Sequence, residues 1–230
     1  MKQQALTLLR RDRVAFMDMI FPVERGDCDI IQADEDGQIV FDHPSGLLFA
    51  NLPDTDGSVQ KLMAVRGAKG YVLHSDALAQ RFNRIVRRKW VMRVMQVVYE
   101  QSQAPSVARV CSIRKLGEQD AEAVREALPY TDEKDMLELI QRGDMYGAFI
   151  SGELAGRIGV HREGCMGLLE VHPSYRRRGV GEALEAHLIR ELRARGLPAY
   201  GQIVRDNTAS IELSRALGLS VSDGEMTILK

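Results

Sequence analysis

The sequence predicts an α/β protein built in two parts, and three observations lead to this view. First, 45% of the 230 residues are hydrophobic, which is enough for a proper core. Second, apolar runs with the spacing of strands alternate with longer runs at helical spacing. Third, the polar stretch Gln101–Ser106 lacks either periodicity. We therefore expect an N-terminal α+β domain over residues 1–105 and a second domain over residues 106–230.

Composition narrows the class of protein. Lys and Arg total 31 against 32 Asp and Glu, so the overall charge gives no reason to expect nucleic acid or an anionic membrane as a partner. The apolar run near the start is too short for a signal peptide, and no segment approaches the roughly 20 apolar residues of a membrane-spanning helix. We expect a cytoplasmic protein. The three cysteines are far apart and form no CxxC pair, so neither a metal site nor a disulfide framework is expected.

The first half begins with helical spacing and continues as a meander of strands. Apolar residues between Lys2 and Phe21 recur at roughly helical spacing, which predicts one or two helices. Asp36-Gly37 separates two apolar runs and predicts a hairpin, and the turn residues His43–Gly46 predict a further strand after it. Gly70–Leu73 predicts one more strand.

A basic segment follows. Ser75 or Asp76 is expected to cap a helix, and residues 81–93 then place six cations around Trp90, a combination found on nucleic-acid-binding surfaces. The alternative is a solvated helix face followed by a partly buried strand over residues 90–99. We favour this alternative and keep RNA association as a competing function. The cations are Arg81, Arg84, Arg87, Arg88, Lys89 and Arg93.

After residue 106 the elements follow a regular order. We expect a strand over residues 108–116 and a helix over 118–128, then a second helix that Thr131 caps and Gly143 closes. Three strands are expected between Met145 and Val171, with turns near residues 151–152 and 162–164.

The last elements alternate between helix and strand. A helix begins near Gly179 and ends at Gly196, and one face of it is apolar. A strand at Ala199–Val204, a helix from Asn207 to Gly218 and a strand at Met226–Leu229 follow. The charged residues of the first of these helices are expected to face away from its apolar stripe: Glu182, Glu185, Arg190 and Arg193.

The stretch Gly167–Gly181, GLLEVHPSYRRRGVG, joins a predicted buried strand to a helix through a basic turn. A helix N-terminus offers unpaired N–H groups and a partial positive charge, and glycines let an anion approach the backbone closely. Three consecutive arginines add mobile positive charge, so the stretch predicts a phosphate or pyrophosphate site. It does not fit a Walker loop, and Leu184 stands where a dinucleotide fingerprint needs its third glycine.

What remains is the pattern RxxGxG, formed by Arg176, Gly179 and Gly181. After one helix and one strand it is followed by a second pattern, which consists of Asn207, Ser210 and Leu217-Gly218-Leu219. Together these patterns resemble the acyl-CoA loop and the following motif of the GNAT superfamily of N-acyltransferases, over about residues 108–230. The resemblance implies a mixed sheet with helices on both sides. It also implies acetyl-CoA or another acyl-CoA as co-substrate.

The two-part layout resembles the glycine N-acyltransferase-like branch of this superfamily. In that branch the first half is a degenerate copy of the same fold. Residues 1–100 contain no second RxxGxG pattern, so any such copy has lost this loop.

The resemblance also implies which residues contact acyl-CoA. Val171 would pair its backbone with the pantetheine arm, and its amide would donate to the oxyanion. Asn207 would contact the arm from the other side, act as a plain helix cap, or do both. The pyrophosphate would be bound by Arg176, Arg177, Arg178, Gly179, Val180 and Gly181.

Transfer to an amine requires that an ammonium group first lose a proton. Strand alternation places Glu170 on the face opposite Val171, and a charged residue inside a strand is costly unless it is used or paired. We therefore predict Glu170 as the general base, with a surface or salt-bridged glutamate as the alternative. His172 is the next candidate.

The leaving thiolate also needs a proton, directly or from water. Many relatives supply it from a tyrosine, and Ser214 stands in that place here. Ser214 is therefore the candidate at this position, although a thiolate with a pKa near about 8.5 can also leave unassisted. A covalent route through Cys165 is not favoured, because Cys165 lies in the turn before the strand.

These observations predict an N-acyltransferase, most simply an N-acetyltransferase. It would move an acetyl or short acyl group from CoA to a primary amine of a small molecule or amino acid, by direct attack in a ternary complex. No metal, membrane or nucleic acid is expected, and the sequence leaves the oligomeric state open, with a homodimer as one arrangement. The competing functions are a non-catalytic acyl-CoA sensor and the RNA-associated protein.

Overall fold

The computed structural model describes residues 1–127 and 133–230. The predicted cap Thr131 lies outside the described residues. The chain forms two compact units, and each consists of more than one stretch of sequence. Unit 1 comprises residues 1–98, 202–208 and 220–230, and unit 2 comprises residues 99–201 and 209–219.

Unit 1 begins with two helices and an antiparallel meander, as the sequence predicts. The hairpin at Asp36-Gly37 joins β1 to β2, β2 pairs antiparallel with β3, and β3 pairs parallel with β4. The strand order is β1-β2-β3-β4-β11-β5. The elements are α1 (Lys2–Leu9), η1 (Arg10–Asp12), α2 (Met17–Arg25), β1 (Cys28–Asp34), β2 (Gly37–Asp42), β3 (Leu47–Asn51), α3 (Asp56–Ala64), β4 (Gly70–Leu73), α4 (Asp76–Val86), β5 (Val91–Tyr99) and β11 (Leu219–Leu229).

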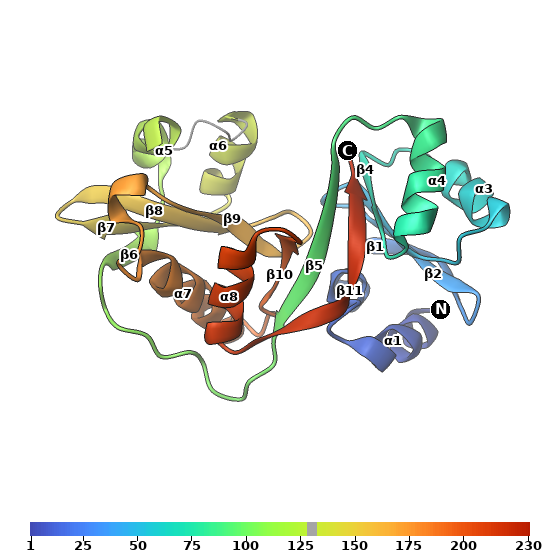
Figure 1. Cartoon of the computed structure of the whole chain (residues 1–230), viewed down its shortest axis with the longest axis horizontal. Coiled ribbons are helices and arrows are strands. Elements are labelled where there is room, and N and C mark those ends of the chain that lie inside the picture. The colour runs from blue at the N-terminus through green and yellow to red at the C-terminus, as the bar shows by residue number, and fades with distance from the viewer. Residues whose placement is uncertain (128–132) are drawn as a thin grey trace. The chain divides into compact units, whose positions relative to one another are not determined.

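Helices α3 and α4 cover the sheet of unit 1, and their apolar residues share one core with β2, β3 and β4 (Figure 1). Ser75 caps α4 by accepting a hydrogen bond from the Leu78 amide, as predicted. The sequence analysis did not identify α3. Its signal is Thr55, whose side chain accepts from the Ser58 amide at the start of the helix.

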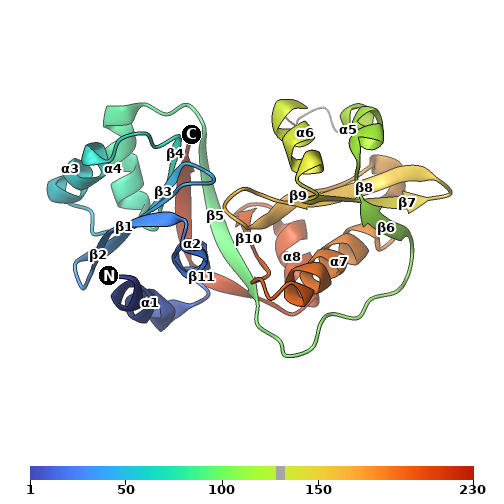
Figure 2. The same cartoon turned by 180° about the vertical axis from the view of Figure 1, so that it is seen from behind.

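Unit 2 has a mixed sheet with helices on both faces, as the family resemblance implies. Its strand order is β10-β9-β8-β7-β6, with antiparallel pairs from β9 to β6 and a parallel pair between β9 and β10. Figures 1 and 2 show α5 and α6 on one face of β7 and β8 and α7 on the other. The elements are β6 (Ser112–Lys115), η2 (Glu118–Asp120), α5 (Ala121–Ala127), α6 (Glu133–Gln141), β7 (Met145–Ile150), β8 (Glu153–Val160), β9 (Met166–Val171), η3 (Pro173–Tyr175), α7 (Val180–Ala194), β10 (Tyr200–Val204) and α8 (Thr208–Ala216).

The predicted last strand, Met226–Leu229, is the end of the longer strand β11. This strand pairs antiparallel with β4, and Lys230 exchanges both backbone hydrogen bonds with Trp90, directly before β5. The division into residues 1–105 and 106–230 stays a prediction. In the structure, however, the final strand of the second predicted domain lies in the sheet of unit 1.

The predicted linker lies along α7 in unit 2. The guanidinium of Arg190 donates to the Pro105 carbonyl oxygen at 2.9 Å, and Arg193 donates to the carbonyl oxygens of Gln101 and Ser102 at 2.9 and 2.7 Å. The sequence predicted only that Arg190 and Arg193 face away from the apolar stripe of α7. In the structure both are bonded to the linker. They fix the linker to the helix that begins at the basic turn.

Candidate functional site

The basic turn after β9 folds as a short loop that ends at the N-terminus of α7. β9 ends at Val171, η3 follows, and Gly179 with φ +77° is the residue before the first helical turn. Arg177 also has a left-handed backbone, with φ +61°. Among the described residues no side chain caps α7, so the first amides of the helix are open to an anion.

Gly179 and Gly181 determine how closely neighbouring segments approach the N-terminus of α7. A methyl group on Gly179 would lie 3.6 Å from both Cγ atoms of Val110 in the linker, and the positive φ disfavours most side chains there. A methyl group on Gly181 would lie 3.6 Å from Val171 Cγ2 and 3.7 Å from Leu213 Cδ2. Gly181 therefore brings α7 close to the end of β9 and to α8.

The three arginines of the loop are exposed. Arg176 Nε donates to the Val171 carbonyl oxygen at 3.1 Å, and the Arg178 guanidinium lies 5.7 Å from the Tyr175 ring centroid. The Tyr175 hydroxyl donates to Glu153 Oε2 at 2.6 Å, which ties the loop to the start of β8. Sequence reasoning did not find this contact, because Glu153 carries no motif signal.

The backbone of Val171 points away from β8. The His172 amide donates to the Ala155 carbonyl oxygen, so His172 and Ala155 form a hydrogen-bonded pair of the antiparallel ladder. The next pair, Val171 with Gly156, is then a pair whose N–H and C=O groups point outward. Within the described residues, the register of β9 with β10 covers Met166 and Gly201. The Val171 amide therefore lies beyond that pairing, where an extended ligand can bond to it.

Glu170 and Val171 lie on opposite faces of β9, as alternation predicts. Gly156 and Val171 face α7, because a methyl group on Gly156 would lie 3.2 Å from Leu184 Cδ1. Glu170 and its ladder partner Arg157 share the face that α5 and α6 cover. The strand is not regular, since Leu168 has φ +58° and the register with β8 shifts beside it, which marks a β-bulge.

Glu170 is ion-paired in the structure. Arg157 Nη2 lies 3.3 Å from Glu170 Oε2, and the side chains are 4% and 32% exposed. Burial lowers the pKa of Arg157, and the hydrogen bond to Glu170 partly offsets this effect. The salt-bridged alternative thus describes Glu170 in the structure, and its role as base stays a prediction.

Ser214 is buried rather than open to a cleft. Its side chain is 1% exposed and its hydroxyl donates to Glu185 Oε1 at 2.8 Å. Glu185, on α7, was expected to face away from the apolar stripe of this helix, and it is buried, at 6% exposure. Burial raises the pKa of Glu185 to about 7, and the hydrogen bond from Ser214 acts in the opposite direction. The periodicity of α7 alone could not reveal this partner on another helix.

The remaining candidates have other surroundings. Asn207 directly precedes α8, as predicted, and is exposed, but it belongs to unit 1, so its role at the acyl-CoA arm stays a prediction. His172 Nδ1 accepts a hydrogen bond from the Ser174 amide. Cys165 is buried, and its thiol lies 3.6 Å from Glu163 Oε1.

The basic segment of unit 1 is partly neutralised by protein groups. Arg81 pairs with Asp54 and Asp56, and Arg93 pairs with Asp76. Residues 91–99 form β5, whose second half is mostly buried, so the strand predicted there is confirmed. These pairs weaken the case for RNA association, which stays a prediction.

Among the described residues, no group of His, Cys, Asp and Glu side chains has the arrangement to hold a metal ion. No helix there combines the length and apolar character needed to cross a membrane.

Comparisons with known proteins relate residues 111–219 to a family of acetyltransferases. Residues 111–219 match the family model described as acetyltransferase (GNAT) family. An acetyltransferase from Sodalis glossinidius is 37% identical over 87 residues, which are 36% of this chain and 61% of that protein. The chain therefore spans less than two thirds of the length of this curated relative.

Solved structures show the same fold over most of the chain. A Drosophila protein matches with a TM-score of 0.61 at 21% identity, over 84% of this chain and 74% of that one. A GCN5-related N-acetyltransferase from Sphaerobacter thermophilus matches with a TM-score of 0.54 at 17% identity, over 100% of this chain and 93% of that one. At these identities the likeness shows the fold alone. The matched segment, the two motifs and the mixed sheet agree, and residues 111–219 of this chain are similar to the GNAT acetyltransferase family.

Proposed function

We propose that this protein is an acyl-CoA-dependent N-acyltransferase. It moves an acetyl or short acyl group from CoA to a primary amine of a small molecule or amino acid. The observation that carries this proposal is the N-terminus of α7, which no described side chain caps and which follows Arg176, Arg177 and Arg178 directly. A pyrophosphate is the group that such an end and such charges bind best.

The proposed binding mode uses the backbone on both sides of the loop. The amides of Val180 and Gly181 receive the pyrophosphate, with Gly179 keeping the approach open. The outward amide of Val171 pairs with the acyl-CoA arm and donates to the oxygen that becomes negative during attack. Arg176, which bonds to the Val171 carbonyl oxygen without ligand, turns toward the phosphates when acyl-CoA binds.

The proposed chemistry is direct attack by the amine in a ternary complex. Glu170 accepts the amine proton from the α5 and α6 side of the sheet, while Arg157 holds its carboxylate in place. Holding both reactants on one strand converts an encounter of two molecules into an internal reaction. A cytoplasmic location and a homodimer belong to the same proposal and rest on the sequence expectations alone.

A second candidate is a non-catalytic acyl-CoA sensor. The burial of Ser214 favours it, because a hydroxyl that is 1% exposed does not reach a bound thioester without help. Both candidate functions require acyl-CoA binding, but only the N-acyltransferase transfers the acyl group to an amine.

The test is to titrate the protein with acetyl-CoA by calorimetry and then to measure release of free CoA thiol against a library of primary amines. Amine-dependent release is the expected result. Binding without release for any amine or acyl chain would select the sensor. If neither acetyl-CoA nor a longer acyl-CoA binds, the proposed function is wrong.

A further inference from the structure

Helices α7 and α8 enclose a hydrogen-bonded pair that the proposed chemistry leaves unused. Glu185 comes from α7 and Ser214 from α8, and their oxygens are 2.8 Å apart. Both residues are buried, at 6% and 1% exposure. A carboxyl group in such a place carries a desolvation cost of several kcal/mol if charged. A buried glutamate therefore calls for a structural or functional explanation.

The pair lies one helical turn further along α7 than the glycine that meets the end of β9. Glu185 is four residues after Gly181, so both lie on the same side of α7, about one 5.4 Å turn apart. Gly181 approaches Val171 and Leu213, the residue before Ser214. Gly181, one turn before Glu185, and Leu213, next to Ser214 in the sequence, therefore both lie near the end of β9.

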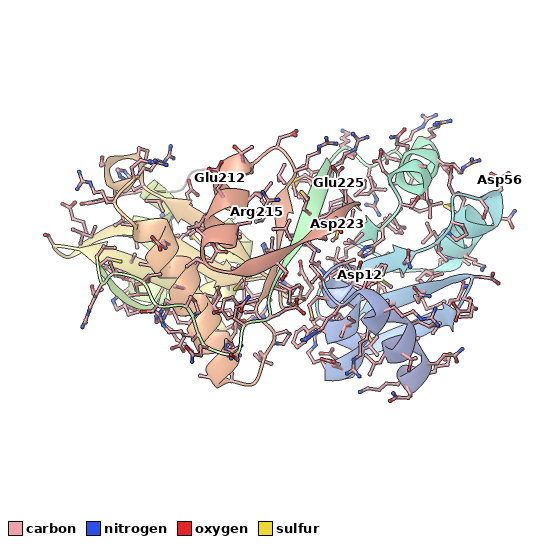
Figure 3. All side chains as sticks on the ribbon, turned by 60° about the horizontal axis from the view of Figure 1, so that its bottom comes forward. Asp12, Asp56, Glu212, Arg215, Asp223 and Glu225 are labelled. Atoms are coloured by element: carbon pink, nitrogen blue, oxygen red, sulfur yellow. The ribbon has the colours of Figure 1, made fainter. Side chains whose placement is uncertain are left out.

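The charged groups around Glu185 do not account for its raised pKa. Burial is the main influence on its pKa, which rises to about 7, so the group holds a proton for about half the time at neutral pH. On α8, Glu212 and Arg215 are exposed (Figure 3). In the sheet under α7, Arg157 and Glu170 occupy the other face. The other titratable groups on α7, β7 and the linker are Glu182, His187, Arg190, Glu191, Arg193, Tyr146, Arg109 and Cys111.

Protonation changes what Ser214 can do. A carboxylate accepts the Ser214 hydrogen, as in the structure. A protonated carboxyl can instead donate its own hydrogen to Ser214 Oγ, which frees the Ser214 hydroxyl hydrogen for another acceptor. The pair thus becomes a donor to another group only while Glu185 holds a proton.

We propose that Glu185, acting through Ser214, supplies the proton that the departing CoA thiolate takes up. This inference rests on the proposed N-acyltransferase function. Glu185 is a positioning and proton-holding residue, and Ser214, which is 1% exposed, donates to the sulfur through one ordered water. Serine in place of the tyrosine of many relatives is then not a loss, because the carboxyl behind it provides the acidity.

The amine nitrogen bonds to the thioester carbon and gives one proton to Glu170, and the C–S bond breaks with its electron pair on sulfur. Ser214 Oγ gives its proton to sulfur through the ordered water and takes the Glu185 proton. Glu185 regains a proton from solvent before the next cycle, and Glu170 releases one. The proton moves from Glu185, whose pKa is about 7, to a thiol whose pKa is about 8.5, so the transfer is favourable.

The first test compares Glu185→Gln with wild type across pH, with Glu212→Gln as the matched control on the exposed face of α8. Wild-type kcat should fall above about pH 7 as Glu185 loses its proton. In Glu185→Gln kcat should drop about 10-fold or more below pH 7, and the falling limb should disappear. Ser214→Ala should show the same drop in kcat and the same loss of the falling limb as Glu185→Gln. Glu212→Gln should keep the wild-type dependence of kcat on pH. A Glu185→Gln enzyme that retains both wild-type kcat and the falling limb overturns the proposal.

The second test needs no turnover. The carboxyl band of Glu185, identified by infrared difference against Glu185→Gln, is titrated with CoA and with desulfo-CoA, which lacks only the sulfur. A shift of the titration midpoint between the two ligands is expected. Equal midpoints with both ligands bound would make Glu185 a structural residue and overturn the proposal. If CoA does not bind at all, the failure lies in the proposed function, and the proton transfer falls with it.

Discussion

At the scale of single residues, Gly179 is the position where the acyl-CoA site is most easily blocked. Its φ of +77° disfavours most side chains, and a side chain there would stand at the start of α7, where we propose that the anion binds. Gly179→Asp adds a negative charge there, and Asp tolerates the left-handed region better than most residues. We expect acetyl-CoA affinity to fall at least about 100-fold, an energy of about 3 kcal/mol, in calorimetry.

The matched control is Gly196→Asp at the other end of α7. Gly196 has a similar φ of +70°, and a methyl group there would meet nothing within 4 Å. It should therefore impose the same backbone strain without affecting affinity. Equal losses in both variants would show that strain, not the anion site, is responsible.

Glu170 is the predicted base, and its substitution separates binding from chemistry. Glu170→Gln should keep acetyl-CoA affinity and lower kcat by about 10²-fold. The loss should shrink as pH rises, because more amine then arrives without its extra proton. Since Arg157 is buried and loses an anionic partner, a melting curve must accompany the kinetics. A normal kcat with an unchanged pH profile would move the base to another residue, with His172 next.

Glu185 predicts a pH-dependent stability as well as a pH-dependent rate. Its pKa rises from the ordinary 4.5 to about 7 on folding, so the folded state binds the proton more tightly. Stability is then fully present below about pH 4.5 and falls as pH rises through about 7, by up to about 3 kcal/mol. Glu185→Gln should match wild type at pH 5 and melt several degrees higher at pH 8. Parallel melting curves at both pH values would contradict the buried, raised pKa.

At the scale of elements, local signals predict much of the fold and long-range contacts account for the rest. The hairpin at Asp36-Gly37 and the strand-loop-helix at 167–181 carry turn residues and periodicity that act within a few positions. Helix α3 was missed because its apolar stripe is short, although Thr55 marks its start. The bulge at Leu168 has no signal in the sequence, because leucine rarely adopts φ +58°.

In the candidate site, too, local signals predict some residues and long-range contacts account for others. The glycines and arginines of the loop are recognisable because an anion site needs those residue types next to a helix start. Glu185 was assigned to the wrong environment, since its partner Ser214 is 29 positions away on another helix. The contact between Tyr175 and Glu153 was missed for the same reason.

At the scale of the whole molecule, the two units repeat one order of elements. Three antiparallel strands, a helix, a parallel strand and a helix occur as β1-β2-β3-α3-β4-α4 in unit 1 and β7-β8-β9-α7-β10-α8 in unit 2. This agrees with the expectation of a degenerate copy. In unit 1 the helix after the third strand begins beside Asp54, Thr55 and Asp56 instead of arginines. A negative and side-chain-capped helix end does not suit a pyrophosphate, so we propose an acyl-CoA site in unit 2 alone.

The path of the chain makes unit 1 depend on residues from the far end of the sequence. β11 lies between β4 and β5 and buries Met226, Ile228 and Leu229. Burying three such side chains contributes about 5–9 kcal/mol, which is as large as the net stability of a typical domain. Without β11, unit 1 would also expose the edges of β4 and β5.

We therefore predict that two fragments cut at the linker behave differently. Residues 106–230 should fold and bind acetyl-CoA within about 3-fold of the full chain, since the α5 and α6 core and the start of α7 remain complete, and a 3-fold change is under about 1 kcal/mol. Residues 1–105 alone should lack a cooperative melting transition, and a peptide of residues 219–230 should restore one. Circular dichroism and hydrogen exchange measure both fragments, and residues 220–230 should exchange fast in the 106–230 fragment. A cooperative, native-like 1–105 fragment would show that β11 is not needed in the sheet, and a molten 106–230 fragment would show that the two predicted domains share a core.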